Sequence, residues 1–215
     1  TDARGCSDIA TVTITEPLQP LTISIAPSNN NGFGTSCLNV ADGTATATVS
    51  GGTIGAGYTY DWAEYPSGTT ISNPLNSTEI IGLAAGDYLC TVTDQEVCQE
   101  SAIVTITEPL TAVNPSSVVT SDYNGQDISC NGAADGVGTA SAIGGTPYPT
   151  GSPYTYEWNT TPIQTTAVAT GLSVAGSPYT CIVTDDNDCS SPTTLVITEP
   201  LPIDTLSTFS TPTNC

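Results

Sequence analysis

The sequence predicts an all-β protein made of tandem β-sandwich repeats, immunoglobulin-like or fibronectin-like in class, with a period of about 91–92 residues. Three observations predict this class: a repeated order of motifs, strand-like alternation of small polar with β-branched or aromatic residues, and no helical periodicity longer than a turn or two. The Ile-Thr-Glu-Pro motif sets the period, since Glu108 follows Glu16 by 92 residues and Glu199 follows Glu108 by 91. Such a period is too long for a solenoid and suits one small sandwich per repeat.

Each strand is expected from alternation bounded by Gly, Pro, Asn and Asp. In chain order the expected strands lie at 10–15, 21–26, 43–49, 58–62, 88–94 and 102–107, and the pattern then repeats. Six or seven strands per repeat are typical of these sandwiches. With the Ile-Thr-Glu-Pro motifs as boundaries, we expect residues 1–17 to be the C-terminal strand of a preceding repeat, 18–109 and 110–200 to be two sandwich repeats, and 201–215 to be the N-terminal segment of a following repeat.

An aromatic motif at 58–62 returns at 154–158. Because side chains alternate across a strand, its two tyrosines and its tryptophan share one face, and one face of this strand is expected to fill the core. A second interpretation places Trp62 and Trp158 on an exposed sheet face, where they would stack on sugar rings.

A Gly-containing corner precedes Tyr88, and the same arrangement precedes Tyr179. We therefore expect each tyrosine hydroxyl to bond back to the backbone at a sandwich corner. Pro follows Glu directly at each boundary, so the linker between repeats is nearly absent. Repeats joined this closely are expected to form a semi-rigid rod.

The composition excludes several classes of function. One Arg, no Lys and 21 acidic residues give a net charge of −20, which disfavours nucleic acid and anionic membranes as partners. No His or Lys is present for acid–base chemistry, so no enzyme activity is expected. Eight Cys without a single His indicate disulfides and an oxidising, extracellular location. No run approaches 18 apolar residues, so no membrane insertion is expected.

The motif order is specific as a set. It reads CNGAADG at 130–136, Gly-Gly-Thr at 144–146, YTYEW at 154–158, Gly-Leu at 171–172, Val-Thr-Asp at 183–185, then Cys189 and Ile-Thr-Glu-Pro, and the preceding repeat follows the same order. This order resembles the SprB repeat of Bacteroidota cell-surface adhesins. The resemblance implies a repeat region of a giant extracellular filament, exported by type IX secretion, that serves surface attachment and, in gliding bacteria, motility.

Two other functions stay open at this point. One is a carbohydrate-binding array of β-sandwich modules, and the other is a subunit of a cross-linked multi-chain extracellular fibre. The expected partners are neighbouring repeats of the same polypeptide, with other filament chains or surface polysaccharide as further candidates.

The cysteines fall into three positional classes: before Ala-Asp-Gly (Cys37, Cys130, Cys215), on the Val-Thr-Asp strand (Cys90, Cys181), and after it (Cys6, Cys98, Cys189). The first and third classes carry the SprB resemblance, which implies the pairs Cys37–Cys98 and Cys130–Cys189. Closing 61 residues would stabilise each repeat by about 4 kcal/mol.

Two rival connectivities remain. Cys90 shares a strand face with Tyr88 and could form an immunoglobulin-style bridge to Cys37, with Cys181 bridged to Cys130. The third possibility staples successive repeats through Cys6–Cys37, Cys98–Cys130 and Cys189–Cys215. Cys90 and Cys181 could also be buried, unpaired thiols.

Carboxylates near the hinges and turns form a candidate calcium site, since calcium takes oxygen ligands. The candidates are Asp42, Asp94, Glu108, Asp135, Asp185, Asp186 and Asp188. They could equally be turn-forming residues on a solvated surface. No other cofactor is expected. Candidate glycosylation sites are the sequons at Asn76 and Asn159, together with Thr205 in an Asp-Thr-Leu motif.

Overall fold

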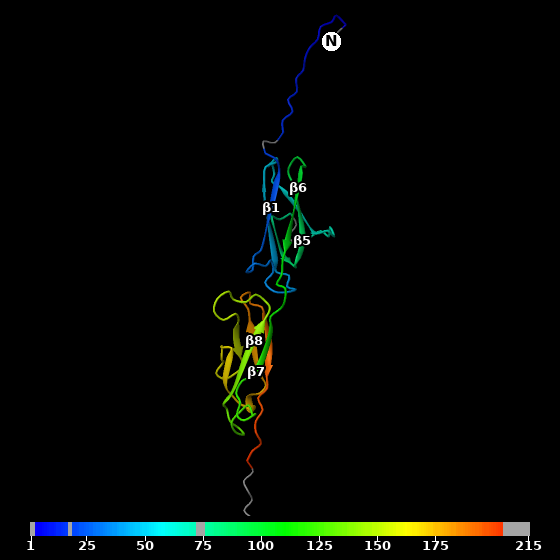
Figure 1. Cartoon of the computed structure of the whole chain (residues 1–215). Helices are drawn as coiled ribbons and strands as arrows, with labels where there is room; N and C mark the ends of the chain where they lie inside the picture. Colours follow the sequence, from blue (N-terminus) through cyan, green and yellow to red (C-terminus); the bar gives the residue numbers. More distant parts are fainter. Residues whose placement is uncertain (1–2, 17–18, 72–75, 204–215) are drawn as a thin grey trace, which may run out of the picture. The chain divides into compact units, whose positions relative to one another are not determined.

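The computed structural model describes residues 3–16, 19–71 and 76–203, which form two compact units (Figure 1). The first unit comprises residues 1–29 and 41–107, and the second comprises 30–40 and 108–215. In the sequence frame the segment 30–40 lies inside the first repeat, but it packs with the second unit. The chain therefore passes from one unit to the other three times.

The first unit consists of two three-stranded antiparallel sheets. One sheet has the order β1 (Thr22–Pro27), β2 (Gly43–Ser50), β4 (Glu79–Leu83). The other has the order β3 (Thr59–Tyr65), β5 (Gly86–Thr93), β6 (Gln99–Ile106). Successive strands therefore alternate between sheets in the middle of the unit, so the two faces enclose one core.

The second unit repeats this topology strand for strand. One sheet has the order β7 (Asn114–Val119), β8 (Gly136–Ile143), β10 (Val168–Leu172). The other has the order β9 (Thr155–Trp158), β11 (Tyr179–Thr184), β12 (Ser190–Leu195). A short 3₁₀ helix, Val174–Gly176, precedes β11. The first, second and fourth strands form one sheet, and the third, fifth and sixth form the other. Among the described residues, this is the immunoglobulin constant-type order without strand D, the edge strand of the four-stranded sheet, and the predicted fold class is confirmed.

Alternation along the strands produces the cores. In β5 the side chains of Tyr88, Cys90 and Val92 are buried, and those between them are partly exposed. Trp62 on β3 lies opposite Cys90 on β5, and Trp158 on β9 lies opposite Cys181 on β11.

The tryptophan face of the aromatic motif fills each core, as expected. Trp62 is 2% exposed and Trp158 is fully buried. Their indole N–H groups donate to the carbonyl oxygens of Ser77 at 2.9 Å and Thr166 at 3.0 Å. The sugar-stacking interpretation is therefore wrong for both tryptophans, because neither ring reaches the surface.

Both predicted tyrosine corners are present. The Tyr88 hydroxyl donates to the Ala84 carbonyl oxygen at 2.9 Å. The Tyr179 hydroxyl donates to the Ser173 carbonyl oxygen at 3.1 Å and accepts the Ser173 N–H at 3.0 Å. Each corner thus fixes the loop that enters the fifth strand of its unit.

The N-terminal segment differs from the expectation. Residues 3–16 are exposed and form no strand in the described part of the chain, although a strand was expected at 10–15. The equivalent strands β6 and β12 pair with β5 and β11, whereas residues 10–15 pair with no strand among the described residues. A single extended segment cannot satisfy its own ladder hydrogen bonds. Across the described residues, no helix is long and apolar enough to span a bilayer.

Candidate functional site

The Gly-Gly-Thr motif forms a tight loop that docks on a buried aspartate. In the second unit Gly144 and Gly145 have φ angles of 79° and 62°, a region that favours glycine. A Cβ on Gly145 would lie 2.3 Å from Oδ2 of Asp185 and 2.6 Å from the Val113 side chain. Glycine therefore permits the close approach that lets the Thr146 N–H donate to Asp185 Oδ2 at 2.7 Å.

The same aspartate holds the cysteine loop. Asp185 is fully buried, and its Oδ1 accepts the N–H of Asn187 at 3.0 Å and of Cys189 at 2.9 Å. One carboxylate thus fixes both the Gly-Gly-Thr loop and the position of Cys189. The spacing Asp-x-x-x-Cys is what brings the cysteine N–H back to the carboxylate.

The first unit has the same arrangement around Asp94. Its carboxylate accepts the N–H of Thr53 at 2.9 Å, of Glu96 at 3.0 Å and of Cys98 at 2.8 Å. These backbone donors, with that of Thr53 foremost, lower the pKa of Asp94. We call residues 94–98 and 185–189 the cysteine loops.

The first tyrosine of the aromatic motif forms a hydrogen bond with the Gly-Gly-Thr loop in each unit. The Tyr58 hydroxyl donates to the Gly51 carbonyl oxygen at 2.7 Å, and Tyr154 donates to that of Gly144 at 2.8 Å. The repeated motifs of the sequence therefore form one hydrogen-bonded assembly that presents a cysteine.

The segment 30–40 docks against the cysteine loop 185–189 within the second unit. It begins with an Asn-Gly turn in which Asn31 has φ 50° and Gly32 has φ 98°. Asn31 Nδ2 donates to Asp186 Oδ2 at 2.9 Å and to Asn187 Oδ1 at 2.7 Å. In return, Asn187 Nδ2 donates to the carbonyl oxygens of Asn30 and Ser36, both at 3.1 Å.

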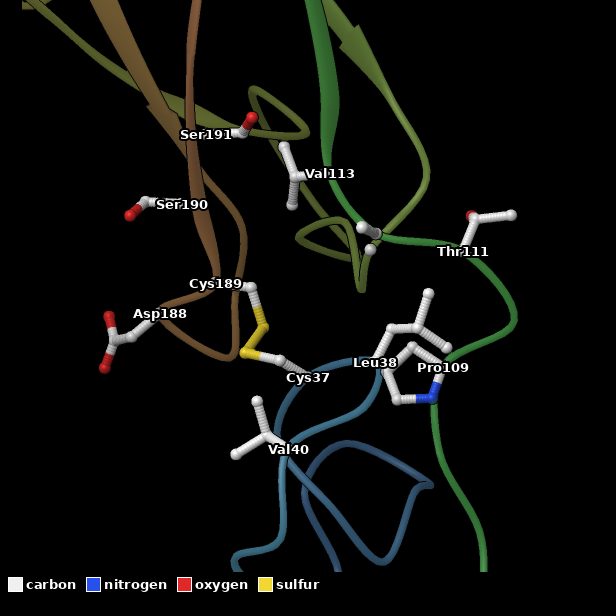
Figure 2. Close-up of a pocket in the computed structure, with 12 residues that line it drawn as sticks. Cys37, Leu38, Val40, Pro109, Thr111, Val113, Asp188, Cys189, Ser190 and Ser191 are labelled. Atoms are coloured by element: carbon white, nitrogen blue, oxygen red, sulfur yellow. A yellow bond between two sulfur atoms is a disulfide. The ribbon is translucent and has the colours of Figure 1, made fainter. Parts of the chain in front are cut away.

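A disulfide closes this contact. Cys37 is bonded to Cys189 with a Cα–Cα distance of 5.8 Å, which lies within the normal range for disulfides. Figure 2 shows the bond beside Leu38, Pro109 and Val113, which line a hollow of about 340 Å³. The two cysteines are 152 residues apart and belong to successive sequence repeats.

This connectivity corrects all three predicted schemes. Cys37 is not paired with Cys98, Cys90 or Cys6, and Cys189 is not paired with Cys130 or Cys215, because these two cysteines are bonded to each other. The resemblance-based scheme had the right two classes of cysteine but the wrong repeat. It assumed that Cys37 stays with its own sandwich, whereas the segment that carries it packs in the second unit.

Among the described residues, Cys90, Cys181, Cys98 and Cys130 carry free thiols. Cys90 and Cys181 are buried, so the predicted bridges Cys37–Cys90 and Cys130–Cys181 are absent. Burial raises the pKa of the Cys90 thiol to about 12 and that of Cys181 to about 11, so both behave as small apolar side chains. Cys98 and Cys130 are exposed and not joined to each other. Cys6 is exposed, and Cys215 lies outside the described residues.

The hinge glutamates brace the cysteine-bearing segments. Glu108 Oε2 accepts the Asn39 N–H at 2.6 Å, and Glu199 Oε2 accepts the Gly132 N–H at 2.8 Å. Asn39 and Gly132 each lie two residues after a cysteine of the class before Ala-Asp-Gly. The glutamate of Ile-Thr-Glu-Pro thus holds the backbone next to Cys37 and Cys130.

The structure does not gather the seven candidate calcium ligands. Asp94 and Asp185 bind backbone N–H groups, Glu108 binds Asn39 and Asp186 binds Asn31, as described above. Asp135 accepts the Ser129 N–H at 3.1 Å. Asp42 is the equivalent of Asp135 in the first sequence repeat, and Asp188 is exposed. Within the described ranges no three such side chains converge on a metal-sized site.

Two of the three candidate glycosylation residues are exposed. The Oδ1 atoms of Asn76 and Asn159 each accept a backbone N–H, from Tyr60 and Thr180 respectively, both at 2.8 Å. Thr205 lies outside the described residues.

Sequence reasoning missed the asparagines that join the segment 30–40 to the cysteine loop. The Asn-Gly dipeptide at 31–32, repeated in frame at 124–125, was an available signal for the turn. Nothing comparable marked Asn187, whose role depends on which segment packs over it.

Fold and site together define a tandem array of immunoglobulin-type sandwiches with cysteine-presenting loops. The family model of the SprB repeat matches residues 35–64, which include Cys37, β2 and nearly all of β3, so the SprB resemblance is confirmed over this range. No curated protein sequence matches the chain.

Two solved structures illustrate the likeness in fold. An amphioxus IgVJ-C2 molecule is 16% identical, with 66% of this chain and 88% of that chain covered and a TM-score of 0.29. Fibronectin(III)-like modules of Clostridium thermocellum CbhA are 12% identical, with 83% and 95% covered and a TM-score of 0.31. The fold assignment rests on strand order and does not depend on these likenesses.

Proposed function

We propose that the chain is a structural repeat region of an extracellular surface adhesin, where it acts as a disulfide-stabilised rod for surface attachment. The observation that carries this proposal is the Cys37–Cys189 bond between successive sequence repeats. The SprB match supports a surface adhesin and extends the proposal to type IX export and gliding motility. A catalytic role has no support from a chain without His or Lys.

The bond changes the path that tension takes along the chain. When the two ends are pulled, load passes from Cys37 directly to Cys189, and residues 38–188 lie outside the loaded path. These residues would add about 500 Å if extended, at roughly 3.3–3.6 Å per residue. With the disulfide intact that length is unavailable, so an array of such repeats resists extension under load. A tether that anchors a cell to a surface needs this property.

Force spectroscopy tests the mechanical proposal. The 215-residue chain is held at its two ends and stretched with and without reductant. We expect the oxidised protein to release little length, and the Cys37→Ser variant to release about 500 Å more. Cys130→Ser is the matched control, because it removes a free thiol of the same class and should behave as the oxidised parent. Equal release from parent and Cys37→Ser would refute the load-bearing role.

Surface location is tested separately. Antibodies raised against the folded chain are expected to label intact producing cells, and external protease should remove the label. Labelling only after permeabilisation would contradict the adhesin proposal. The carbohydrate-array alternative is disfavoured because both tryptophans that would stack on sugars are buried.

A further inference from the structure

Two hollows, each beside a free thiol, correspond to the two sides of the hollow around the disulfide. We call the hollow around the disulfide closed, because the bond joins its two sides, and the other two open. The hollow of about 390 Å³ beside Cys98 is lined by Leu21 and Gly52. In the sequence frame these are the equivalents of Val113 and Gly145, which line the closed hollow beside Cys189. The equivalence holds in contacts also, since a Cβ on Gly52 would meet Leu21 and Asp94, just as one on Gly145 would meet Val113 and Asp185.

The other side of the closed hollow has its own open counterpart. A hollow of about 420 Å³ is lined by Cys130, Asn131 and Pro200. These residues are the frame equivalents of Cys37, Leu38 and Pro109. The two open hollows, which we call the Cys98 half-site and the Cys130 half-site, together contain the frame equivalents of most of the residues that line the hollow around the Cys37–Cys189 bond.

Each half-site holds its thiol as the bonded cysteine is held. The Cys98 N–H binds Asp94 at 2.8 Å, and the bonded Cys189 binds Asp185 at 2.9 Å. On the other side, the Cys130 carbonyl oxygen accepts the N–H three residues on at 3.0 Å, and that of Cys37 does so at 3.3 Å. Both thiols are exposed and free.

We propose that the Cys98 and Cys130 half-sites are complementary and are filled by a second copy of this chain, docked head to tail. Cys130 of one copy then bonds to Cys98 of the next, in the way Cys37 bonds to Cys189. Such a contact is heterologous, because the two half-sites differ, so the same contact can repeat in one direction from copy to copy. This inference rests on the proposed structural role and supplies the partner of the array.

The polar contacts are only partly reproduced at the new junction. Asn124, the equivalent of Asn31, also has a left-handed backbone, with φ 57° and 50° respectively, and can donate to Gln95 and Glu96. Glu96 stands at the position of Asn187 and has no hydrogen to donate to backbone carbonyls. The junction between copies is therefore weaker than the closed one, and Glu96 is the residue that weakens it.

Bond formation needs a disulfide oxidant, for which oxidised glutathione is suitable. The Cys130 thiolate attacks one glutathione sulfur, and one reduced glutathione leaves. The Cys98 thiolate of the second copy then attacks the Cys130 sulfur of the mixed disulfide, and the second reduced glutathione leaves. Two protein thiols are oxidised, one glutathione disulfide is reduced, and the two thiol protons pass to the leaving glutathione thiolates.

The test mixes two variants in a Cys6→Ser, Cys215→Ser background. One variant also carries Cys98→Ser and the other Cys130→Ser, with one of them isotopically labelled. Treatment with oxidised glutathione is followed by intact mass measurement and peptide mapping. We expect nearly all dimer to be the heterodimer linked by Cys130–Cys98. Random oxidation would make only half of the dimer heterodimeric and would overturn the proposal.

Further outcomes test the same proposal. Absence of dimer, or a Cys98–Cys130 bond within one copy of the background protein, would also overturn the proposal. Adding Glu96→Asn to the Cys130→Ser variant is expected to speed heterodimer formation several-fold, because it restores the donors found at Asn187. Glu79→Asn removes the same charge from an exposed position on β4, away from the residues that line the half-site, and should have no effect. The force experiment depends only on the Cys37–Cys189 bond, so the two proposals can fail separately.

Discussion

Asp185 is predicted to be the residue on which the cysteine loop of the second unit depends most. It is fully buried and accepts three backbone N–H groups, those of Thr146, Asn187 and Cys189. Asp185→Asn is expected to keep Oδ1, which accepts two of the three N–H groups, and to turn its amide donor toward the Thr146 N–H. One buried donor is left unsatisfied, at about 1–3 kcal/mol, and the remaining bonds lose their charge assistance. We expect a total loss of about 3 kcal/mol in the free energy of unfolding.

Urea unfolding measures this loss within one unit. Each unit contains one tryptophan, so in a Trp62→Phe background the fluorescence of Trp158 reports the second unit alone. With a slope of about 1–2 kcal/mol per M, the urea midpoint should fall by roughly 1.5–3 M. Asp188→Asn makes the same chemical change at an exposed side chain and should leave the midpoint nearly unchanged. Equal midpoints for the two variants would refute the assigned role of Asp185.

Three further predictions concern acid, thiol reactivity and backbone strain. Hydrogen bonds, that from the Thr53 N–H foremost, lower the pKa of Asp94. The contribution of Asp94 to stability is therefore complete above the unfolded-state pKa and falls as pH drops through the folded-state pKa. Urea midpoints measured by Trp fluorescence between about pH 5 and 2 should decline less in Asp94→Asn than in the parent. Burial raises the pKa of the Cys90 thiol to about 12, so alkylation at pH 8, mapped by peptide mass, should modify Cys90 only after unfolding. Gly145→Ala should destabilise the second unit in urea by more than Gly151→Ala, because both have positive φ but only the Gly145 Cβ would meet other atoms, and equal losses would contradict this.

Local patterns were enough to predict the sandwich and its core. Alternation placed Trp62 and Trp158 on the buried face, and the corner before Tyr88 and Tyr179 predicted their backbone bonds. These features depend on residues near in sequence and on strand geometry shared by all sandwiches. The N-terminal strand failed for the complementary reason, since a strand also needs a partner that local alternation does not supply.

The disulfide could not be predicted because a repeating sequence does not say which copy of a motif meets which. The pattern assigned Cys37 and Cys189 to the two classes that do pair. Choosing the partner from the next repeat required knowing that the segment 30–40 packs with the second unit. The contacts that decide this include those of Asn31 and Asn187, and two asparagines in polar turns give no distinctive pattern.

A comparison of the two cysteine loops shows which features of the loop depend on the disulfide and which do not. Cys98 carries no disulfide, yet its loop makes the same two N–H bonds to Asp94 that the bonded Cys189 loop makes to Asp185. The sandwich therefore builds the loop before any oxidation, and the disulfide joins a cysteine that is already positioned. Preorganisation of this kind reduces the ordering cost of forming the bond. The stabilisation by the bond then comes chiefly from restricting a 152-residue loop in the unfolded chain, about 5 kcal/mol in the chain-entropy model.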